Sequence, residues 1–283
     1  MSLFISSLNS GSNGNCYYVG NHQEAVLVDV GISCREVERR MLRIGMPMNR
    51  VKAIFITHEH TDHIKGVTVL SEKYQLPVYI SKSTLAHSRL RLNQNLLKDF
   101  SKDKAVIVGG LSVLPFSKLH DAVDPHSFLI SYEGINVGVF TDLGGVCGNL
   151  VKHFKQCHAA FLESNYDEEM LANGNYPFYL KQRISGGLGH LSNKEAIELF
   201  VNHHSPSMSH LILSHLSNNN NCPKVVQSLF DGHATSVVKI VASRYEETAL
   251  FEVQNPCFSK VPKKNSTSKK MAHYTAQLRL SFD

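Results

Sequence analysis

The sequence contains no tryptophan, and its aromatic residues make up only 8% of 283 residues. An extensive platform of aromatic rings for stacking nucleic-acid bases is therefore not expected. The longest apolar runs, such as residues 25–30 and 53–56, are far too short to cross a bilayer. Residues 1–9 lack the basic start and the long apolar stretch of a signal peptide. These absences predict a cytoplasmic protein that does not use a membrane.

The six cysteines are scattered along the chain, and none forms a C-x-x-C pair. Disulfide frameworks belong mainly to small exported proteins, so reduced thiols are expected here. Hydrophobic residues make up 42% of the chain and charged residues 19%. This balance is enough to bury a sizeable core, and it excludes disorder of the whole chain.

The net charge of +5 comes from the last thirty residues, where six basic side chains face a single acidic one. The polar, aperiodic residues 254–276 predict a flexible basic linker. Such a segment can attract a polyanion, or it can serve only as a solubilising disordered end. The folded part of the chain is expected to span residues 1–253.

Two blocks of mostly strand-forming sequence are each followed by helices, which predicts an α/β sandwich of two sheets with helices outside. Strands are expected at residues 3–8, 16–19, 25–30, 51–57, 78–81, 105–108, 111–119, 127–132, 137–141, 159–163, 210–214, 237–241 and 249–253. Helices are expected at residues 33–44, 65–74, 83–93, 143–156, 167–172, 178–185, 193–203 and 223–230. Ser33 is the expected N-cap of the first helix, and Ser192 with Glu195 predicts a capping box before residue 193.

A dense group of polar side chains follows the apolar strand at residues 51–57 directly. It reads His58-x-His60-x-Asp62-His63, which is four candidate metal ligands within six residues. In a loop at a strand end, His58 and His60 can turn to one point and Asp62 and His63 to a neighbouring point. Imidazole and carboxylate ligands suit zinc, manganese or iron.

Further candidate ligands follow other apolar strands one at a time. His120, Asp142 and His215 each come after a predicted strand, and Asp29 lies at the end of residues 25–30. Loops at strand ends bring side chains from separate strands into one pocket. We therefore expect these residues to complete the metal site, with Asp29 supporting the ligands from behind.

Together these residues resemble the metallo-β-lactamase fold superfamily over roughly residues 1–253. The resemblance implies a four-layer αββα sandwich that forms a catalytic domain over this range. It implies two divalent metal ions per chain, Zn²⁺ or Mn²⁺, and the following ligands: His58, His60 and His120 for one ion, Asp62, His63 and His215 for the other, and Asp142 bridging both. Asp29 is then the buried carboxylate that orients the histidine motif by hydrogen bonds.

Two such ions can hold a shared hydroxide and neutralise charge on a phosphoryl or carbonyl oxygen. The site keeps a net positive charge because only two of its seven ligands are carboxylates, so it favours an anionic transition state. Hydrolysis is the expected reaction class, with Asp62 among the catalytic residues.

Two other segments favour a phosphodiester substrate. The loop at residues 10–15 can present backbone N–H groups to a phosphate near Ser12, Asn13 and Asn15, or it can be a plain tight turn. His190 lies in a segment that resembles the histidine motif of phosphodiesterase branches such as tRNase Z, although it can also be a surface residue. Glu163 lies where those enzymes carry a supporting glutamate, so we expect a Glu163–His190 acid pair.

The segments SGSNGNCY, THEHTDH, LHDA, FTDLG, GHLSN and LSHLSNNNN together resemble the YycJ/WalJ-type branch of the superfamily. This resemblance implies a bacterial 5′-to-3′ DNA exonuclease that acts on 5′ ends in replication or repair. Residues 82–104 carry six basic and two acidic side chains; they can guide DNA to the site or form an ordinary charged surface. The alternatives are a hydrolase of the same fold for a cyclic phosphodiester, thioester or lactone, and a non-catalytic metal-bound adaptor.

The end of the chain, residues 277–283, resembles the short peptide that docks bacterial DNA enzymes on the sliding clamp. Leu280 and Phe282 would anchor this peptide in an apolar groove, and Gln277 would give a directional hydrogen bond. A flexible linker before it would keep the enzyme concentrated at DNA. The alternative is that this segment adds an edge strand.

Overall fold

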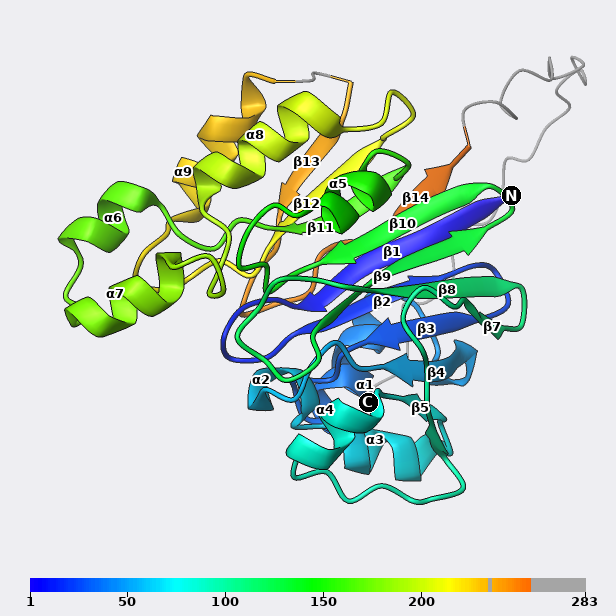
Figure 1. Ribbon diagram of the computed structural model, residues 1–283. Coiled ribbons are helices and arrows are strands. Elements are labelled where there is room, and N and C mark those ends of the chain that lie inside the picture. Colours follow the sequence, from blue (N-terminus) through cyan, green and yellow to red (C-terminus); the bar gives the residue numbers. More distant parts are fainter. Residues whose placement is uncertain (234–235, 256–283) are drawn as a thin grey trace, which may run out of the picture.

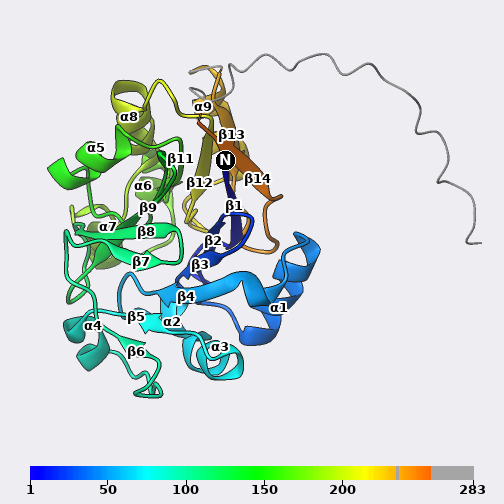
Figure 2. The same ribbon diagram turned by 90° about the vertical axis from the view of Figure 1, so that its right-hand side faces the viewer.

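The computed structural model describes residues 1–233 and 236–255. Within these ranges, two seven-stranded mixed sheets pack face to face with helices on their outer sides (Figure 1). Figure 2 shows α1 and α3 on the opposite side of the molecule from α5 and α8. The expected α/β class and four-layer αββα arrangement are therefore confirmed.

The first sheet has the strand order β14-β1-β2-β3-β4-β5-β6. Its strands are β1 (Ser2–Asn9), β2 (Cys16–Gly20), β3 (Ala25–Val28), β4 (Val51–Phe55), β5 (Val78–Tyr79), β6 (Leu97–Lys98) and β14 (Phe251–Gln254). Its accompanying helices are α1 (Cys34–Arg43), the 3₁₀ turn η1 (Met48–Arg50), α2 (Thr61–Ile64), α3 (Val67–Tyr74) and α4 (Lys82–His87).

The second sheet has the order β13-β12-β11-β10-β9-β8-β7. Its strands are β7 (Val106–Val108), β8 (Leu111–Ser117), β9 (His126–Tyr132), β10 (Ile135–Phe140), β11 (Ala159–Glu163), β12 (His210–Ser214) and β13 (Val238–Val241). Its helices are α5 (Gly148–Phe154), α6 (Glu168–Asn173), α7 (Phe178–Ser185), α8 (Asn193–His203) and α9 (Pro223–Asp231).

The main core lies between the two sheets and is built from their inward-facing side chains. Phe55 of the first sheet meets Phe128 of the second edge-to-face, with ring centroids 5.5 Å apart. Tyr17 packs on Phe161 with the two rings tilted by 51° and their centroids 5.0 Å apart. Burying each such ring contributes roughly 1.5–3 kcal/mol to the free energy of folding. Each sheet has one further core on its outer face, between the sheet and the helices that cover it.

Parallel pairing places the functional segments at one edge of the sandwich. Strands β3 and β4 are parallel neighbours in the first sheet, and β10, β11 and β12 are parallel neighbours in the second. The carboxyl ends of parallel strands point the same way, so the loops that follow them gather together. These loops contain most of the expected site residues.

Two expected helices are shorter by several residues in the structure than the sequence predicted, while those expected at residues 33–44 and 65–74 differ by one or two residues at their ends. The helix expected at residues 83–93 ends at His87, because Leu90 and Leu92 lie in irregular chain and pack against the core under the first sheet. The helix expected at residues 143–156 begins only at Gly148. Before it, Gly144 lies so close to the backbone of Leu188 that a Cβ there would be 2.4 Å from the Leu188 Cα.

The last strand, β14, ends at Gln254, one residue inside the segment expected to be a linker. The remaining linker beyond Asn255, and the clamp-binding residues Gln277, Leu280 and Phe282, lie outside the described residues. No helix in the described part of the chain has both the length and the apolar composition to span a membrane.

Candidate metal centre

The histidine motif is held in place by the carboxylate of Asp29, which is completely buried. The backbone N–H of Thr57 donates to its Oδ1 at 2.8 Å, and the Thr57 hydroxyl donates to its Oδ2 at 2.8 Å. Nδ1 of His63 lies 2.7 Å from the same Oδ2. This contact fixes the His63 ring and leaves its Nε2 for the site.

The last two candidate ligands of the motif, Asp62 and His63, lie on a single helical turn that follows His60. His60 is the N-cap of α2, so Asp62 and His63 lie in the first turn of a short helix. Nε2 of His58 is 3.1 Å from Nδ1 of His60, and Nε2 of His63 is 3.5 Å from Oδ2 of Asp62. The motif therefore presents its side chains to two adjacent points.

Side chains that follow strands of the second sheet complete two groups of candidate ligands. His120, which follows β8, comes together with His58 and His60, with the three ligand atoms within 4.8 Å of one another. His215, which follows β12, forms a second such group with Asp62 and His63. The structure thus combines side chains of both sheets in each group.

Asp142, which follows β10, lies between the two groups. Its Oδ2 is 3.2 Å from Nε2 of His63, and its Oδ1 is 3.4 Å from Nδ1 of His215 and 3.9 Å from Nε2 of His120. All seven side chains expected as metal ligands are therefore gathered around one carboxylate.

The donor atoms of this cluster fit divalent metal ions. Oδ2 of Asp142 and Nε2 of His215 are buried, and neither makes a hydrogen bond within the described residues. Buried polar atoms without a partner are rare unless something else satisfies them. Histidine nitrogens with carboxylate oxygens are the donor set preferred by zinc and also used by manganese.

The pKa shifts differ between the two groups of ligands. Burial lowers the pKa of His120 to about 4 and the pKa of His58 well below its usual value, so both rings are neutral and able to bind a cation. Burial raises the pKa of Asp142, but His215 and His63 outweigh burial and hold it well below the usual range. Burial lowers the pKa of His63 and of His215 as well, but Asp142 and the neighbouring carboxylates outweigh burial and raise both. A cation that binds these two rings therefore displaces a proton.

Glu163, at the end of β11, lies behind this cluster and is completely buried. Its Oε1 is 2.8 Å from Nδ1 of His190 and 2.8 Å from Nδ1 of His215. The backbone N–H groups of Leu143 and Leu191 donate to its Oε2. Burial raises the pKa of Glu163, but the contacts with His190 and His215 outweigh burial and lower it to about 2. One ionised carboxylate thus holds two imidazoles.

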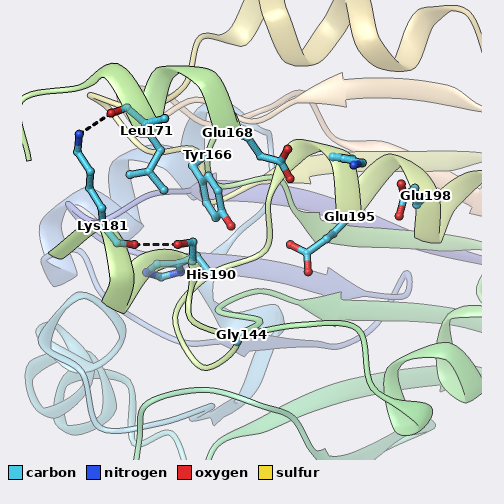
Figure 3. A pocket seen from close by; sticks show the side chains of 12 residues that line it. Gly144, Tyr166, Glu168, Leu171, Lys181, His190, Glu195 and Glu198 are labelled. Carbon is cyan, nitrogen blue, oxygen red and sulfur yellow. Dashed lines mark hydrogen bonds between the residues drawn. The ribbon is translucent and has the colours of Figure 1, made fainter. Parts of the chain in front are cut away.

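His190 is more open than the residues around it, with 24% of its side chain exposed. It lines a cavity of 560 Å³ between α6, α7 and α8, together with Tyr166, Lys181 and Glu195 (Figure 3). It also lines a second cavity, of 230 Å³, together with His215 and Ser12. His190 is therefore positioned where a ligand can reach both it and the cluster.

The loop at residues 10–15 packs tightly against the histidine motif. Ser12 is exposed and faces the smaller cavity, whereas the Asn13 amide donates to the carbonyl of Arg244 at 2.7 Å. Nδ2 of Asn15 donates to Oδ2 of Asp62 at 3.2 Å. Of the three residues expected to bind phosphate, only Ser12 is thus directed to open space near the cluster.

Comparison with known families places the chain. The family model described as the Metallo-beta-lactamase superfamily matches residues 10–174. The chain belongs to this superfamily. As expected from the sequence, it is a metal-dependent hydrolase of the metallo-β-lactamase fold.

Other members of the superfamily resemble the chain over most of its length. The "Exodeoxyribonuclease YycJ" of Bacillus anthracis is 35% identical over 231 residues, which are 80% of this chain and 87% of the relative. The "Exodeoxyribonuclease WalJ" of Streptococcus pneumoniae strain R6 is 32% identical over 221 residues, which are 76% of this chain and 82% of the relative. The expected resemblance to this branch is confirmed.

Solved structures show the same fold at low identity. The metallo-β-lactamase fold protein YhfI from Bacillus subtilis has a TM-score of 0.69 and 15% identity, and covers 89% of this chain and 100% of its own. Zn²⁺-bound PqqB from Methylobacterium extorquens has a TM-score of 0.65 and 14% identity, with 88% and 99% covered.

The role of Lys118 at this site was not predicted from the sequence. Lys118 is buried behind the cluster, and its Nζ donates to the carbonyl of Thr141 at 2.7 Å. Burial lowers the pKa of Lys118, although Asp142 acts in the opposite direction. The lysine fixes the backbone just before Asp142. The only signal in the sequence is its position two residues before His120.

Proposed function

We propose that the chain is a divalent-metal phosphodiesterase that removes nucleotides from the 5′ ends of DNA. Its work would be a 5′-to-3′ exonuclease step in DNA replication or repair, in the cytoplasm. The observation that carries this proposal is the Glu163–His190 pair, with Oε1 2.8 Å from Nδ1, at the mouth of the metal centre. The names of the two relatives at 35% and 32% identity support DNA as the substrate.

The proposal assigns the ligands as follows. One ion would be held by His58, His60 and His120, a second by Asp62, His63 and His215, and both by Asp142. Zn²⁺ and Mn²⁺ both suit this donor set. When bound, such ions supply Lewis acidity and a water molecule of lowered pKa.

The residues of the chain supply positioning and proton transfer. Glu163 engages Nδ1 of His190, so the ring meets the substrate through Nε2. In 5′-to-3′ hydrolysis the leaving atom is the 3′ oxygen of the released nucleotide, and it needs a proton. A histidine oriented by a buried carboxylate is suited to give that proton.

The approach of DNA is supported by charge on the surface. Lys82, Arg89 and Arg91 are exposed on α4 and the segment after it, and Lys82 lies 3.6 Å from Asp99. Exposed cations of this kind can neutralise phosphates along a strand. We further propose that the terminal peptide with Gln277, Leu280 and Phe282 docks on the bacterial sliding clamp.

The test is a digestion of end-labelled duplex DNA that carries a 5′ phosphate. The manganese-loaded and zinc-loaded proteins are compared with the His60→Ala variant loaded in the same way. We expect stepwise release of mononucleotides from the 5′ end, which the variant does not give. Release from the 3′ end would contradict the polarity, and no cleavage with either metal would favour a small phosphodiester or thioester substrate.

A further inference from the structure

A separate cavity of 460 Å³ lies beside the metal centre, between the loop after β12 and the loop after β13. Ser217 lines both this cavity and the 230 Å³ cavity that contains His190 and His215. Ser10, whose hydroxyl accepts a hydrogen bond from the backbone N–H of His215 at 2.7 Å, also lines it. The two cavities are therefore neighbours that share Ser217 as a lining residue.

Charge in this cavity favours an anion. Of the described residues that line it, Arg244 is the one with a formal charge, and none is Asp or Glu. Nη1 of Arg244 is buried and has no hydrogen-bond partner within the described part of the chain. A buried guanidinium N–H without an acceptor is unfavourable. The Arg244 side chain lines the cavity, so a change of its rotamer would bring the guanidinium to a phosphate oxygen bound there.

A hydroxyl group adds a second donor. Oγ of Ser243 accepts hydrogen bonds from the backbone N–H groups of Tyr245 at 3.0 Å and Glu246 at 3.4 Å. Its two acceptor sites are thereby used, so its own hydrogen remains for a ligand. Ser243 and Arg244 are neighbours in sequence and line the same cavity.

The rest of the cavity is suited to an aromatic ring. Leu216, Pro223 and Val241 form apolar walls. Tyr245 lines the cavity as well, yet it is 74% exposed. An exposed tyrosine ring is a surface on which a nucleobase can stack, and such stacking does not depend on base sequence.

The segment that carries these groups is fixed from both sides. The Asn13 amide donates to the carbonyl of Arg244 at 2.7 Å, and Nη2 of the buried Arg40 donates to the carbonyl of Tyr245 at 3.0 Å. The backbone under Arg244 and Tyr245 is therefore held before any ligand arrives, which lowers the entropic cost of binding.

We propose that this cavity binds one nucleotide of the substrate strand away from the scissile bond, with its phosphate on Arg244 and its base against Tyr245. This rests on the proposed function for the identity of the strand, while the chemistry of the cavity requires only a nucleoside phosphate. A strand that runs past Ser217 would connect this nucleotide to the bond beside His190.

The first test uses the absence of tryptophan. Tyr245→Trp gives the chain a single tryptophan whose fluorescence reports on this cavity alone. We expect 2′-deoxyadenosine 5′-monophosphate to quench it saturably, and the nucleoside without phosphate to bind about tenfold more weakly. In the Tyr245→Trp protein, the additional substitution Arg244→Ala should weaken binding of the nucleotide by the same factor. The control substitution Arg35→Ala, at an exposed position of α1, should leave binding of the nucleotide unchanged. Equal binding of nucleotide and nucleoside, no quenching, or no effect of Arg244→Ala would overturn the proposal.

The second test separates a nucleotide of the strand from a free nucleotide. Single strands of two to ten nucleotides with 5′ phosphates are digested by the wild type, Arg244→Ala and Arg244→Lys. We expect KM to fall with length in the wild type, and Arg244→Ala to raise KM about tenfold for the longer strands only. Arg244→Lys should restore part of the difference.

The outcomes of the two tests are distinguishable. Digestion with no effect of Arg244→Ala at any length would overturn the strand subsite and leave the proposed function intact. Quenching that depends on Arg244 in a protein that digests no DNA would reject the proposed function and show a site for a free nucleotide.

Discussion

Asp29, Asp142 and His215 share an uncommon backbone conformation. Their φ angles are 59°, 53° and 58°, in the left-handed region that non-glycine residues rarely adopt. Each residue directly follows a strand, or follows it by a residue or two, and there the left-handed turn points its side chain across the sheet edge. Strain of this kind, of order 1–3 kcal/mol per residue, persists where surrounding contacts enforce it. The backbone as well as the side chain is thus specialised at these positions.

At this scale the sharpest prediction concerns His190. His190→Ala should lower kcat by about 10²–10⁴ and change KM much less, because a proton donor acts in the transition state. Steady-state kinetics on a 5′-phosphorylated strand measures both constants. His87→Ala, which removes an exposed histidine from α4, is the matched control. A rise in KM alone would make His190 a binding residue.

Helix α8 begins at Asn193, three residues after His190, and its start is set by local sequence. The Ser192 hydroxyl accepts from the N–H of Glu195 at 3.1 Å, and the Glu195 carboxylate accepts from the N–H of Ser192 at 2.9 Å. These reciprocal bonds form the expected capping box. The segment that carries His190 is thereby anchored to a helix end.

Ser192→Ala should destabilise the protein by about 1 kcal/mol, because it leaves the backbone N–H of Glu195 without its acceptor. Urea unfolding measures the change in the free energy of unfolding. Ser83→Ala, at an exposed position in the first turn of α4, should change it by less than about 0.5 kcal/mol. Equal effects of the two substitutions would contradict the capping argument.

Elements with strong local signals could be predicted from the sequence. Ser33 and Ser192 mark helix starts, and residues 159–163, 178–185, 193–203 and 210–214 were predicted with the bounds that the structure has. The predictions were wrong where tertiary packing decides, as at residues 88–93, where half-buried Leu90 and Leu92 pack against the core and the chain is not helical.

The same division applies to the site. The side chains that gather around Asp142 could be predicted because each one follows an apolar strand. The contact of Lys118 with the carbonyl of Thr141, and that of Asn15 with Asp62, could not be predicted, because they join segments 23 and 47 residues apart without a local pattern. The Arg244 cavity likewise depends on how two loops meet.

On the scale of the whole molecule, the metal centre connects the two sheets. His58 and His63 come from the loop after β4, while Asp142 follows β10 in the other sheet, and their ligand atoms lie within 4.8 Å of one another. An ion bound by these residues would therefore hold the sheets together at this edge, in addition to the core between them.

Removing the metal should consequently lower the melting temperature. An ion present at 100 times its Kd stabilises the folded state by about 2.7 kcal/mol, and chelation removes this contribution. Thermal unfolding with and without chelator, followed by addition of Zn²⁺ or Mn²⁺, measures the effect. His60→Ala should show a smaller shift on chelation. The same shift in both proteins would contradict the proposed ligands.

The terminal peptide is tested by its removal. Deleting residues 277–283 should abolish binding to the sliding clamp and leave the digestion of short free DNA unchanged, because the peptide is separate from the metal centre in sequence. Surface plasmon resonance on immobilised clamp measures the first, and the labelled-DNA digestion measures the second. Unchanged clamp binding would reject docking through Gln277, Leu280 and Phe282.

Because the candidate ligands are divided between the two sheets, the chain can be cut into two fragments that each contain only part of the site. The stretch at residues 101–104, between β6 and β7, is exposed, and a cut there would separate the histidine motif from His120, Asp142 and His215. Neither fragment would contain any of the three groups that combine both sheets. The second fragment would return β14 to the edge of the first sheet beside β1, which gives the halves a ladder on which to join. Hydrolysis would then be a signal that appears only when two separately expressed pieces have reassembled.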